Sequence, residues 1–261
     1  MCKMLGISAK SRNAANDLLR EFFSYAEQNP HGWGLARFNE DGALAAPGVE
    51  KEPVKATVSE HLRHLFEDKI DNPTILAHIR FATVGTMEYE NCHPFTCADD
   101  SGRVWTLVHN GTVFSGTALN DYVGLQFGET DSERVLLHLI ARINRAHDRL
   151  RRPLTEEERF NVLSSAIGAL AKGNKLNLLV FDGEIMYVHT NFRDSLYFMK
   201  ENGSLAFSTD PLSQGSWKSV PFMRLIAVKA GEFVREGTPH GNEYIHNPDD
   251  YRFVYMNFAR L

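Results

Sequence analysis

Residues 176–190 read LNLLVFDGEIMYVHT, and this stretch decides the fold class. Two apolar runs, 176–181 and 185–190, flank Asp182-Gly183. Asp-Gly favours the positive-φ turns whose twist suits an antiparallel hairpin, so the stretch predicts two paired strands. The same pattern recurs twice, at 195–200 and 205–209 around Asn202-Gly203, and at 225–228 and 232–234 around Gly231.

The rest of the chain adds further strands and several helices. Short β-rich runs predict strands at 34–38, 74–81 and 104–109. Apolar stripes at helical spacing lie within 18–26, 135–143 and 163–170. Thr155 and Glu158 are spaced as a capping box before the third stripe, and Ser59 is placed to cap a shorter helix that contains Leu62, Leu65 and Phe66. Hairpins separated by paired helices predict a layered α+β fold rather than a doubly wound parallel sheet.

Composition narrows the class of protein. The 261 residues include 28 Lys and Arg against 33 Asp and Glu, a net charge of −5, with 43% hydrophobic residues. This balance is typical of a globular domain and argues against a general nucleic-acid binder. We expect one domain over residues 1–261, because no linker is visible. No apolar run approaches the length of a membrane helix, and three cysteines cannot build a disulfide framework, so we expect a cytoplasmic protein.

The start of the chain, Met1-Cys2, carries the first candidate for chemistry. The small side chain of Cys2 permits removal of Met1, which would place a thiol and the free α-amine on one residue. An α-amine titrates near neutral pH and can act as a general base, and a thiolate is a strong nucleophile. Taken alone, Cys2 is better explained as an ordinary second residue of a frayed terminus.

Four further residues have side chains or backbone groups suited to binding charged groups of a substrate or of a reaction intermediate. Arg80 ends an apolar strand and could hold a carboxylate through two parallel hydrogen bonds. Asn110 and Gly111 offer N–H donors to an oxyanion. Asp131 could pair with an ammonium group.

Each of these residues also has a simpler interpretation. Arg80 could extend its head to water, Asn110-Gly111 could form a hairpin turn, and Asp131 could be a helix N-cap.

Five separated motifs, taken in order, point to a family. They are Cys2, HIRFAT at 78–83, HPF at 93–95, HNG at 109–111 and TDSE at 130–133. In order and spacing they resemble class II glutamine amidotransferases, which are N-terminal-nucleophile (Ntn) hydrolases. The resemblance implies a four-layer α/β/β/α sandwich of antiparallel sheets. The segment HGWGLA at 31–36 is most similar to the small stand-alone members, including relatives of the ergothioneine-pathway amidohydrolase.

The resemblance also implies roles for individual residues. Cys2 is the nucleophile and its amine the base, while Asn110 and Gly111 form the oxyanion hole. Arg80 holds the α-carboxylate of glutamine and Asp131 its α-ammonium. Thr83 and His93 belong to the matching motifs and are expected at the substrate pocket, with His93 supporting it by hydrogen bonding.

The sequence departs from the family pattern at several points. Phe81 and Val84 stand where many members have Trp and His, and His31 maps to no catalytic position. The chain length leaves no room for the synthase domain of bifunctional members, so an ammonia-accepting synthase would be a separate partner.

The function expected from the resemblance is release of ammonia from glutamine or a γ-glutamyl amide through a Cys2 thioester. Two alternatives stay open: hydrolysis of one specific γ-glutamyl metabolite, and a non-catalytic glutamine-binding sensor or partner subunit. We expect no cofactor, no nucleic-acid partner and no membrane contact.

Two other clusters invite a different interpretation. Cys92, His93 and Cys97, with His78 and His109, contain metal-ligating residue types, but they lack the second paired set of a metal site, so no metal is expected. The basic stretch 142–152 suggests a partner surface, although a solvated helix end that favours cations is the commoner explanation.

Overall fold

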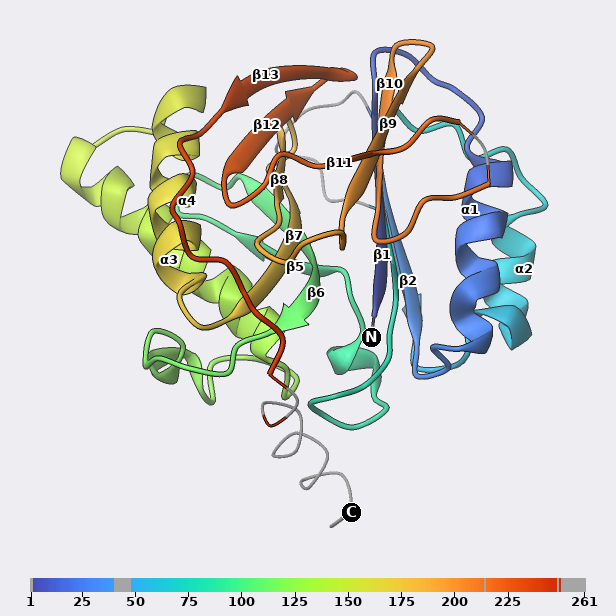
Figure 1. The fold of residues 1–261 in the computed structure, drawn as a ribbon, viewed down its shortest axis with the longest axis horizontal. Helices are drawn as coiled ribbons and strands as arrows, with labels where there is room; N and C mark the ends of the chain where they lie inside the picture. Colours follow the sequence, from blue (N-terminus) through green and yellow to red (C-terminus); the bar gives the residue numbers. More distant parts are fainter. Residues whose placement is uncertain (1, 40–47, 214, 248, 250–261) are drawn as a thin grey trace.

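Two antiparallel sheets lie face to face, with helices on both outer sides. The computed structural model describes residues 2–39, 48–213, 215–247 and 249. Figure 1 shows the layers in order: α3 with α4, the sheet that holds β6 and β7, the sheet that holds β1 and β2, and α1 with α2. The four-layer α/β/β/α sandwich expected from the sequence is confirmed.

The first sheet places the start of the chain at its centre. Its strand order is β11-β9-β10-β1-β4-β2-β3. In β1, Leu5 lies opposite Ser208 of β10 on one side and Ala77 of β4 on the other. The strands are β1 (Lys3–Ala9), β2 (Trp33–Phe38), β3 (Gly48–Glu52), β4 (Thr74–Ile79), β9 (Tyr197–Glu201), β10 (Ser204–Ser208) and β11 (Lys218–Ser219).

The second sheet has the order β13-β12-β8-β7-β6-β5. Its longest strand, β6, runs antiparallel to β7, and Asn110 lies opposite Asn177. The strands are β5 (Phe95–Ala98), β6 (Val104–Thr112), β7 (Lys175–Phe181), β8 (Met186–His189), β12 (Leu225–Lys229) and β13 (Glu232–Glu236).

Two of the four described α-helices begin at the caps that the sequence predicts. The Ser59 side chain accepts from the Leu62 N–H, and Thr155 with Glu158 forms the expected capping box. The helices are α1 (Asn16–Ser24), α2 (Glu60–Leu65), α3 (Asp131–Leu150) and α4 (Glu156–Leu170), with short 3₁₀ helices at Tyr25–Glu27, Ala56–Val58, Tyr89–Asn91 and Asn120–Tyr122. No helix in the described part of the chain is long and apolar enough to cross a membrane.

All three predicted hairpins are confirmed, as β7–β8, β9–β10 and β12–β13. The turn residues Asn202 and Gly203 have φ values of 50° and 72°, the left-handed geometry that favours Asn-Gly. Four strands were not predicted: β1, β3, β5 and β11. The strand predicted at 104–109 continues to Thr112, so Asn110-Gly111 lies inside β6 and is not a hairpin turn.

Three apolar clusters hold the layers together. One fills the space between the two sheets and includes Met4, Val108, Leu179 and Phe207. A second lies between the second sheet and α3 with α4, and a third lies between the first sheet and α1 with α2. Removing this surface from water is the main favourable contribution to folding.

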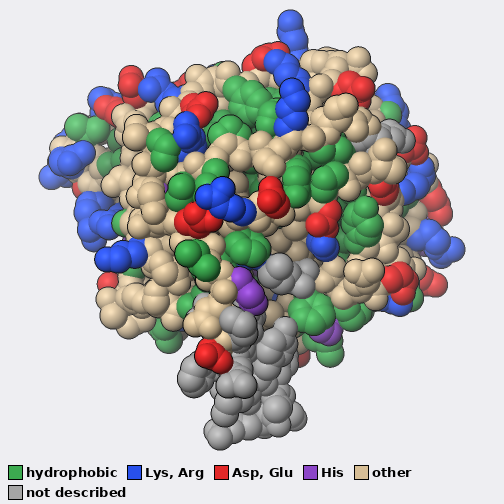
Figure 2. Space-filling view, in the orientation of Figure 1, with side chains coloured by type: hydrophobic (Ala, Val, Ile, Leu, Met, Phe, Trp, Pro, Cys, Tyr) green, Lys and Arg blue, Asp and Glu red, His purple; other side chains and the backbone are tan. Residues whose placement is uncertain are grey.

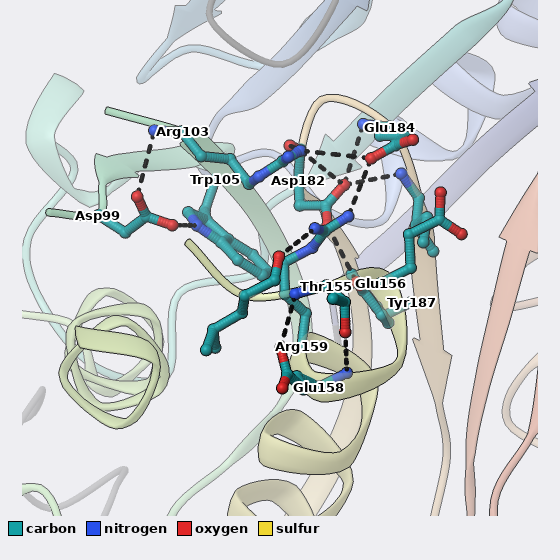
Figure 3. A network of polar contacts seen from close by, with 12 residues as sticks. Asp99, Arg103, Trp105, Thr155, Glu156, Glu158, Arg159, Asp182, Glu184 and Tyr187 are labelled. Carbon is teal, nitrogen blue, oxygen red and sulfur yellow. Dashed lines mark hydrogen bonds and ion pairs between the residues drawn. The ribbon is translucent and has the colours of Figure 1, made fainter. Parts of the chain in front are cut away.

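A buried polar network anchors α4 to the β7–β8 turn (Figure 3). Asp182 is fully buried, and its carboxylate accepts from Arg159 Nε at 2.7 Å and from the Tyr187 hydroxyl at 2.9 Å. The same carboxylate accepts from the backbone N–H groups of Glu184 and Ile185, which shapes the turn. Arg159 also donates to Glu184 at 2.9 Å. Because the Arg159 cation is buried, it would be a costly unpaired charge without the Asp182 carboxylate.

Replacing Asp182 with Asn should therefore lower the free energy of unfolding by about 3 kcal/mol, because it removes the charge that faces a buried guanidinium. Urea denaturation followed by circular dichroism measures this. Glu232→Gln is the matched control, since it breaks the exposed Lys200–Glu232 pair and should leave the unfolding midpoint unchanged. Equal midpoints for Asp182→Asn and the parent would contradict a structural role for the network.

Candidate active site

Cys2 lies at one end of the sandwich, one residue before β1, where the first sheet meets the end of β6 (Figure 1). It lines two adjoining spaces. One is a narrow crevice shared with Thr83, Asn110 and Gly111, and the other is a hollow of about 240 Å³. The antiparallel pairing of β1 with β4 brings Cys2 next to the residues that follow β4.

The Cys2 thiol contacts the backbone of Phe81. Sγ lies 3.3 Å from the Phe81 N–H, which can donate to a thiolate, and 3.3 Å from the Phe81 carbonyl, which can accept from a thiol. Burial raises the pKa of the Cys2 thiol, and the Phe81 N–H with the positive charges of Arg80 and Lys175 acts in the opposite direction. The backbone therefore offers a partner to either protonation state.

Asn110 and Gly111 reach the crevice from the last residues of β6. The Asn110 side chain is buried, and its Nδ2 lies 3.4 Å from Thr209 Oγ1. Gly111 packs directly against β7: a Cβ at this position would stand 1.9 Å from the Lys175 carbonyl. Glycine is required here because the neighbouring strand leaves no space for a side chain. Both predicted oxyanion donors thus line the same crevice as Cys2.

The hollow of about 240 Å³ is lined by charged and polar groups. Lys3 and Asp210 form an ion pair on its wall. Lys175, Asp194 and Asn110 also line it. Its shape and polarity suit a small polar molecule in contact with the thiol.

Arg80 is buried and does not line either space beside Cys2. Its guanidinium donates to the carbonyls of Val84, Gly85 and Thr86 at 2.9–3.0 Å. Arg80 therefore fixes the loop that follows Thr83, while Thr83 itself lines the crevice.

Asp131 is the first residue of α3, and the N-cap is Thr130, whose side chain accepts from the Glu133 N–H. The N-cap is therefore the residue before Asp131, and the interpretation of Asp131 itself as the N-cap is wrong. The Asp131 carboxylate accepts from the Val113 N–H at 2.8 Å, just beyond the end of β6. Asp131 does not line either space beside Cys2, so the described conformation brings it near the end of β6 but not to the thiol.

His93 packs by ring stacking. Its ring lies 4.0 Å from that of His78, and neither ring nitrogen has a hydrogen-bond partner in the described part of the chain. The expected hydrogen bond from His93 is therefore not present. Burial holds the pKa of both imidazoles far below the usual range, at about 3 for His78. Gly34 allows this packing, because a Cβ there would lie 1.9 Å from the His93 carbonyl.

No group of three or more His, Cys, Asp or Glu side chains within the described ranges is placed to hold a metal ion. Cys92 and Cys97 are free thiols. The Cys92 thiol is buried, and burial raises its pKa to about 11, which disfavours the thiolate that a metal requires.

Three residues at the site were not predicted. Lys175 begins β7 and lines both spaces beside Cys2. Thr209 accepts from the Met4 N–H at 3.0 Å and contacts Asn110, so it joins β1 to β6. His31 Nδ1 accepts from the Ala82 N–H at 2.9 Å and holds the segment after Arg80. An isolated lysine at a strand end carries no sequence signature, and Thr209 and His31 meet the site only through tertiary contacts.

The basic stretch 142–152 faces outward. Arg142, Arg145 and Arg149 are exposed on α3, and Figure 2 shows Lys and Arg side chains at the edge of the molecule where α3 and α4 lie. Arg152 pairs with Glu158 at 2.7 Å beyond the helix end. This exposure agrees with a solvated helix end.

The described geometry suits nucleophilic attack on a small carbonyl. The Cys2 thiol, the two candidate oxyanion donors and Thr83 line one narrow crevice. Such an arrangement stabilises the negative oxygen that forms during acyl transfer.

Comparisons with known proteins identify relatives of this chain. The family model described as class-II glutamine amidotransferases matches residues 1–203. An uncharacterised protein of Methanocaldococcus jannaschii is 28% identical over 90% of this chain and 71% of its own length. YafJ of Escherichia coli, described as a candidate glutamine amidotransferase, is 29% identical over 73% of this chain and 74% of its own length.

Solved structures show the same fold. A protein of Pseudomonas aeruginosa described as a predicted glutamine amidotransferase superposes with a TM-score of 0.56 at 21% identity, over 90% of this chain and all of its own. The glutamine phosphoribosylpyrophosphate amidotransferase of B. subtilis superposes with a TM-score of 0.64 at 16% identity, over 89% of this chain. This chain spans about half (48%) of that enzyme. With a family model that covers residues 1–203, the chain belongs to the class-II glutamine amidotransferases.

Proposed function

We propose that this chain is an N-terminal cysteine amidohydrolase that releases ammonia from glutamine or a γ-glutamyl amide. The observation that carries the proposal is the shared crevice of Cys2, Asn110 and Gly111, which come from opposite sheets and distant parts of the sequence. We propose further that Met1 is removed, so that the thiol and the α-amine belong to the same residue.

The reaction follows from this arrangement. The α-amine of Cys2 takes the thiol proton, and Sγ attacks the side-chain carbonyl carbon of the substrate. Asn110 Nδ2 and the Gly111 N–H stabilise the resulting oxyanion. When the C–N bond breaks, the protonated amine gives its proton to the departing ammonia, which leaves a γ-glutamyl thioester. The amine then activates water, which attacks the thioester and releases glutamate and the thiol.

The proposal assigns the amino-acid end of the substrate to Arg80 and Asp131, with Thr83 on the crevice wall and His93 as packing behind it. Arg80 already donates to three loop carbonyls, and Asp131 accepts from Val113. To reach a substrate, Arg80 would use its remaining N–H groups or exchange one of these bonds, so substrate binding and the order of the 84–86 loop are coupled.

The hollow of about 240 Å³ supports a second candidate substrate. It lies beside Cys2 and Asn110 and is far larger than an ammonia molecule, so it could hold the substituent of a γ-glutamyl amide. Comparing turnover of glutamine with that of N-substituted γ-glutamyl amides separates the two substrates. Ammonia could also pass to a separate synthase instead of being released to water.

The first prediction concerns Cys2. Protein whose intact mass shows that it begins at Cys2 should hydrolyse glutamine, and Cys2→Ala should lower kcat by about 10³-fold or more because the nucleophile is lost. A glutamine-like diazo-ketone should label Cys2 alone. Cys92→Ala is the matched control and should retain the parent rate. Undiminished hydrolysis by Cys2→Ala would exclude the mechanism, and glutamine binding without turnover would favour the sensor.

The second prediction concerns Arg80. Arg80→Lys should raise KM for glutamine about tenfold with a smaller change in kcat, because an ammonium cannot reproduce the guanidinium fork. The probe 4-aminobutanamide, which is glutamine without the α-carboxylate, separates binding from loop order. If Arg80 holds the carboxylate, the variant loses the preference for glutamine over this amide. If Arg80 only orders the loop, both substrates decline equally and the carboxylate assignment is wrong.

A further inference from the structure

We propose that Lys175 is a positioning residue of the Cys2 centre, whose buried ammonium stabilises the thiolate form of Cys2 and disfavours protonation of the α-amine. This inference rests on the proposed role of Cys2 as nucleophile. The Lys175 charge would then lower the pKa of both the Cys2 thiol and the α-amine.

The strand geometry places Lys175 at the centre. It is the first residue of β7 and lies opposite Thr112, the last residue of β6. It lines the crevice with Cys2 and Gly111, and it also lines the hollow with Cys2 and Asn110. Lys175 is only 1% exposed, so its ammonium acts in a medium where charges interact strongly.

The Lys175 side chain is held in a defined position. Its Nζ lies 4.5 Å from the centroid of the Phe192 ring, a cation–π contact. Its backbone carbonyl packs against Gly111 and lies 3.3 Å from His109 Nε2. The aromatic contact thus places the ammonium at a buried position over the Phe192 ring.

The electrostatics of the pair are reciprocal. Burial lowers the pKa of Lys175 to about 8, and the negative charge of a Cys2 thiolate acts against that decrease. Burial raises the pKa of the Cys2 thiol, and the positive charge of Lys175 acts against that increase. Each charged form is therefore favoured by the other, and Lys175 remains largely protonated at neutral pH.

Other charged groups around the pair act in different ways. The Arg80 cation also favours the Cys2 thiolate, although its guanidinium donates to the carbonyls of the 84–86 loop. The Lys3 cation, which is paired with Asp210, lowers the pKa of Lys175 further. His109 is buried, and burial keeps its pKa low, so it is neutral at pH 7. Asp194 stands exposed at the hollow. Lys175 is thus a buried cation common to both spaces beside the thiol.

The test measures the rate at which iodoacetamide alkylates Cys2 across pH 5–10, with the modified peptide quantified by mass spectrometry. Removing the positive charge makes thiolate formation harder. The midpoint of the alkylation rate against pH should therefore rise by about one pH unit in Lys175→Met. At pH 7 the alkylation rate should fall about tenfold. Lys175→Arg keeps the charge and should retain most of the parent midpoint.

Lys51→Met is the matched control, because Lys51 is a half-buried lysine that donates to the Cys92 carbonyl, outside both spaces. It should leave the Cys2 midpoint unchanged. Thermal unfolding identifies misfolded variants, and Lys175→Gln replaces Lys175→Met if that variant does not fold. Equal midpoints in the parent and the folded neutral variant would overturn the inference.

Activity distinguishes this inference from the proposed function. The acid limb of the kcat/KM profile for glutamine should move to higher pH in Lys175→Met. Without the nearby cation, the thiolate is less stable and the protonated α-amine is more stable, so the pKa values of both groups rise. If the parent shows no glutaminase activity, the proposed function fails, while the alkylation midpoint still reports on Lys175. If the parent is active and neither profile moves, only the Lys175 inference fails.

Discussion

The pairing of β1 between β10 and β4 is the constraint on which the site depends. β1 is hydrogen-bonded on both sides along most of its length, with Leu5 opposite Ser208 and Ala77. Thr209, directly after β10, accepts from the Met4 N–H and contacts Asn110. A chain terminus is ordinarily free to fray, but here strand pairing begins at the residue after Cys2. The position of Cys2 is therefore fixed by the central strand of a sheet.

Local sequence patterns predicted the elements that are determined locally. The three hairpins and the two caps at Ser59 and Thr155 depend on residues close together in the chain, and all are present. β1 was not predicted because its partner strands lie far away in the sequence, so no adjacent turn motif indicates a hairpin. β11 has two residues and β3 is a partly exposed edge strand, so neither carries a strong pattern.

The site shows the same division between local and distant information. The dipeptide Asn110-Gly111 locally favours a turn, but the facing backbone of β7 keeps it extended within β6. Ordered motifs identified Cys2, Asn110 and Gly111, which share the crevice. The motifs did not indicate that Arg80 and Asp131 already bind backbone groups, because those partners depend on loop conformation. Lys175 was missed because an isolated lysine at a strand end has no signature of its own.

The late arrival of β10 has a consequence for the order of events during synthesis. Residues 204–209 leave the ribosome roughly 10–40 s after the N-terminus, at about 5–20 residues per second. Until then, β1 lacks one of its two neighbouring strands and Asn110 lacks Thr209. The proposed removal of Met1 could then take place before the first sheet is complete. The topology would therefore separate the proposed removal of Met1 from the completion of the first sheet.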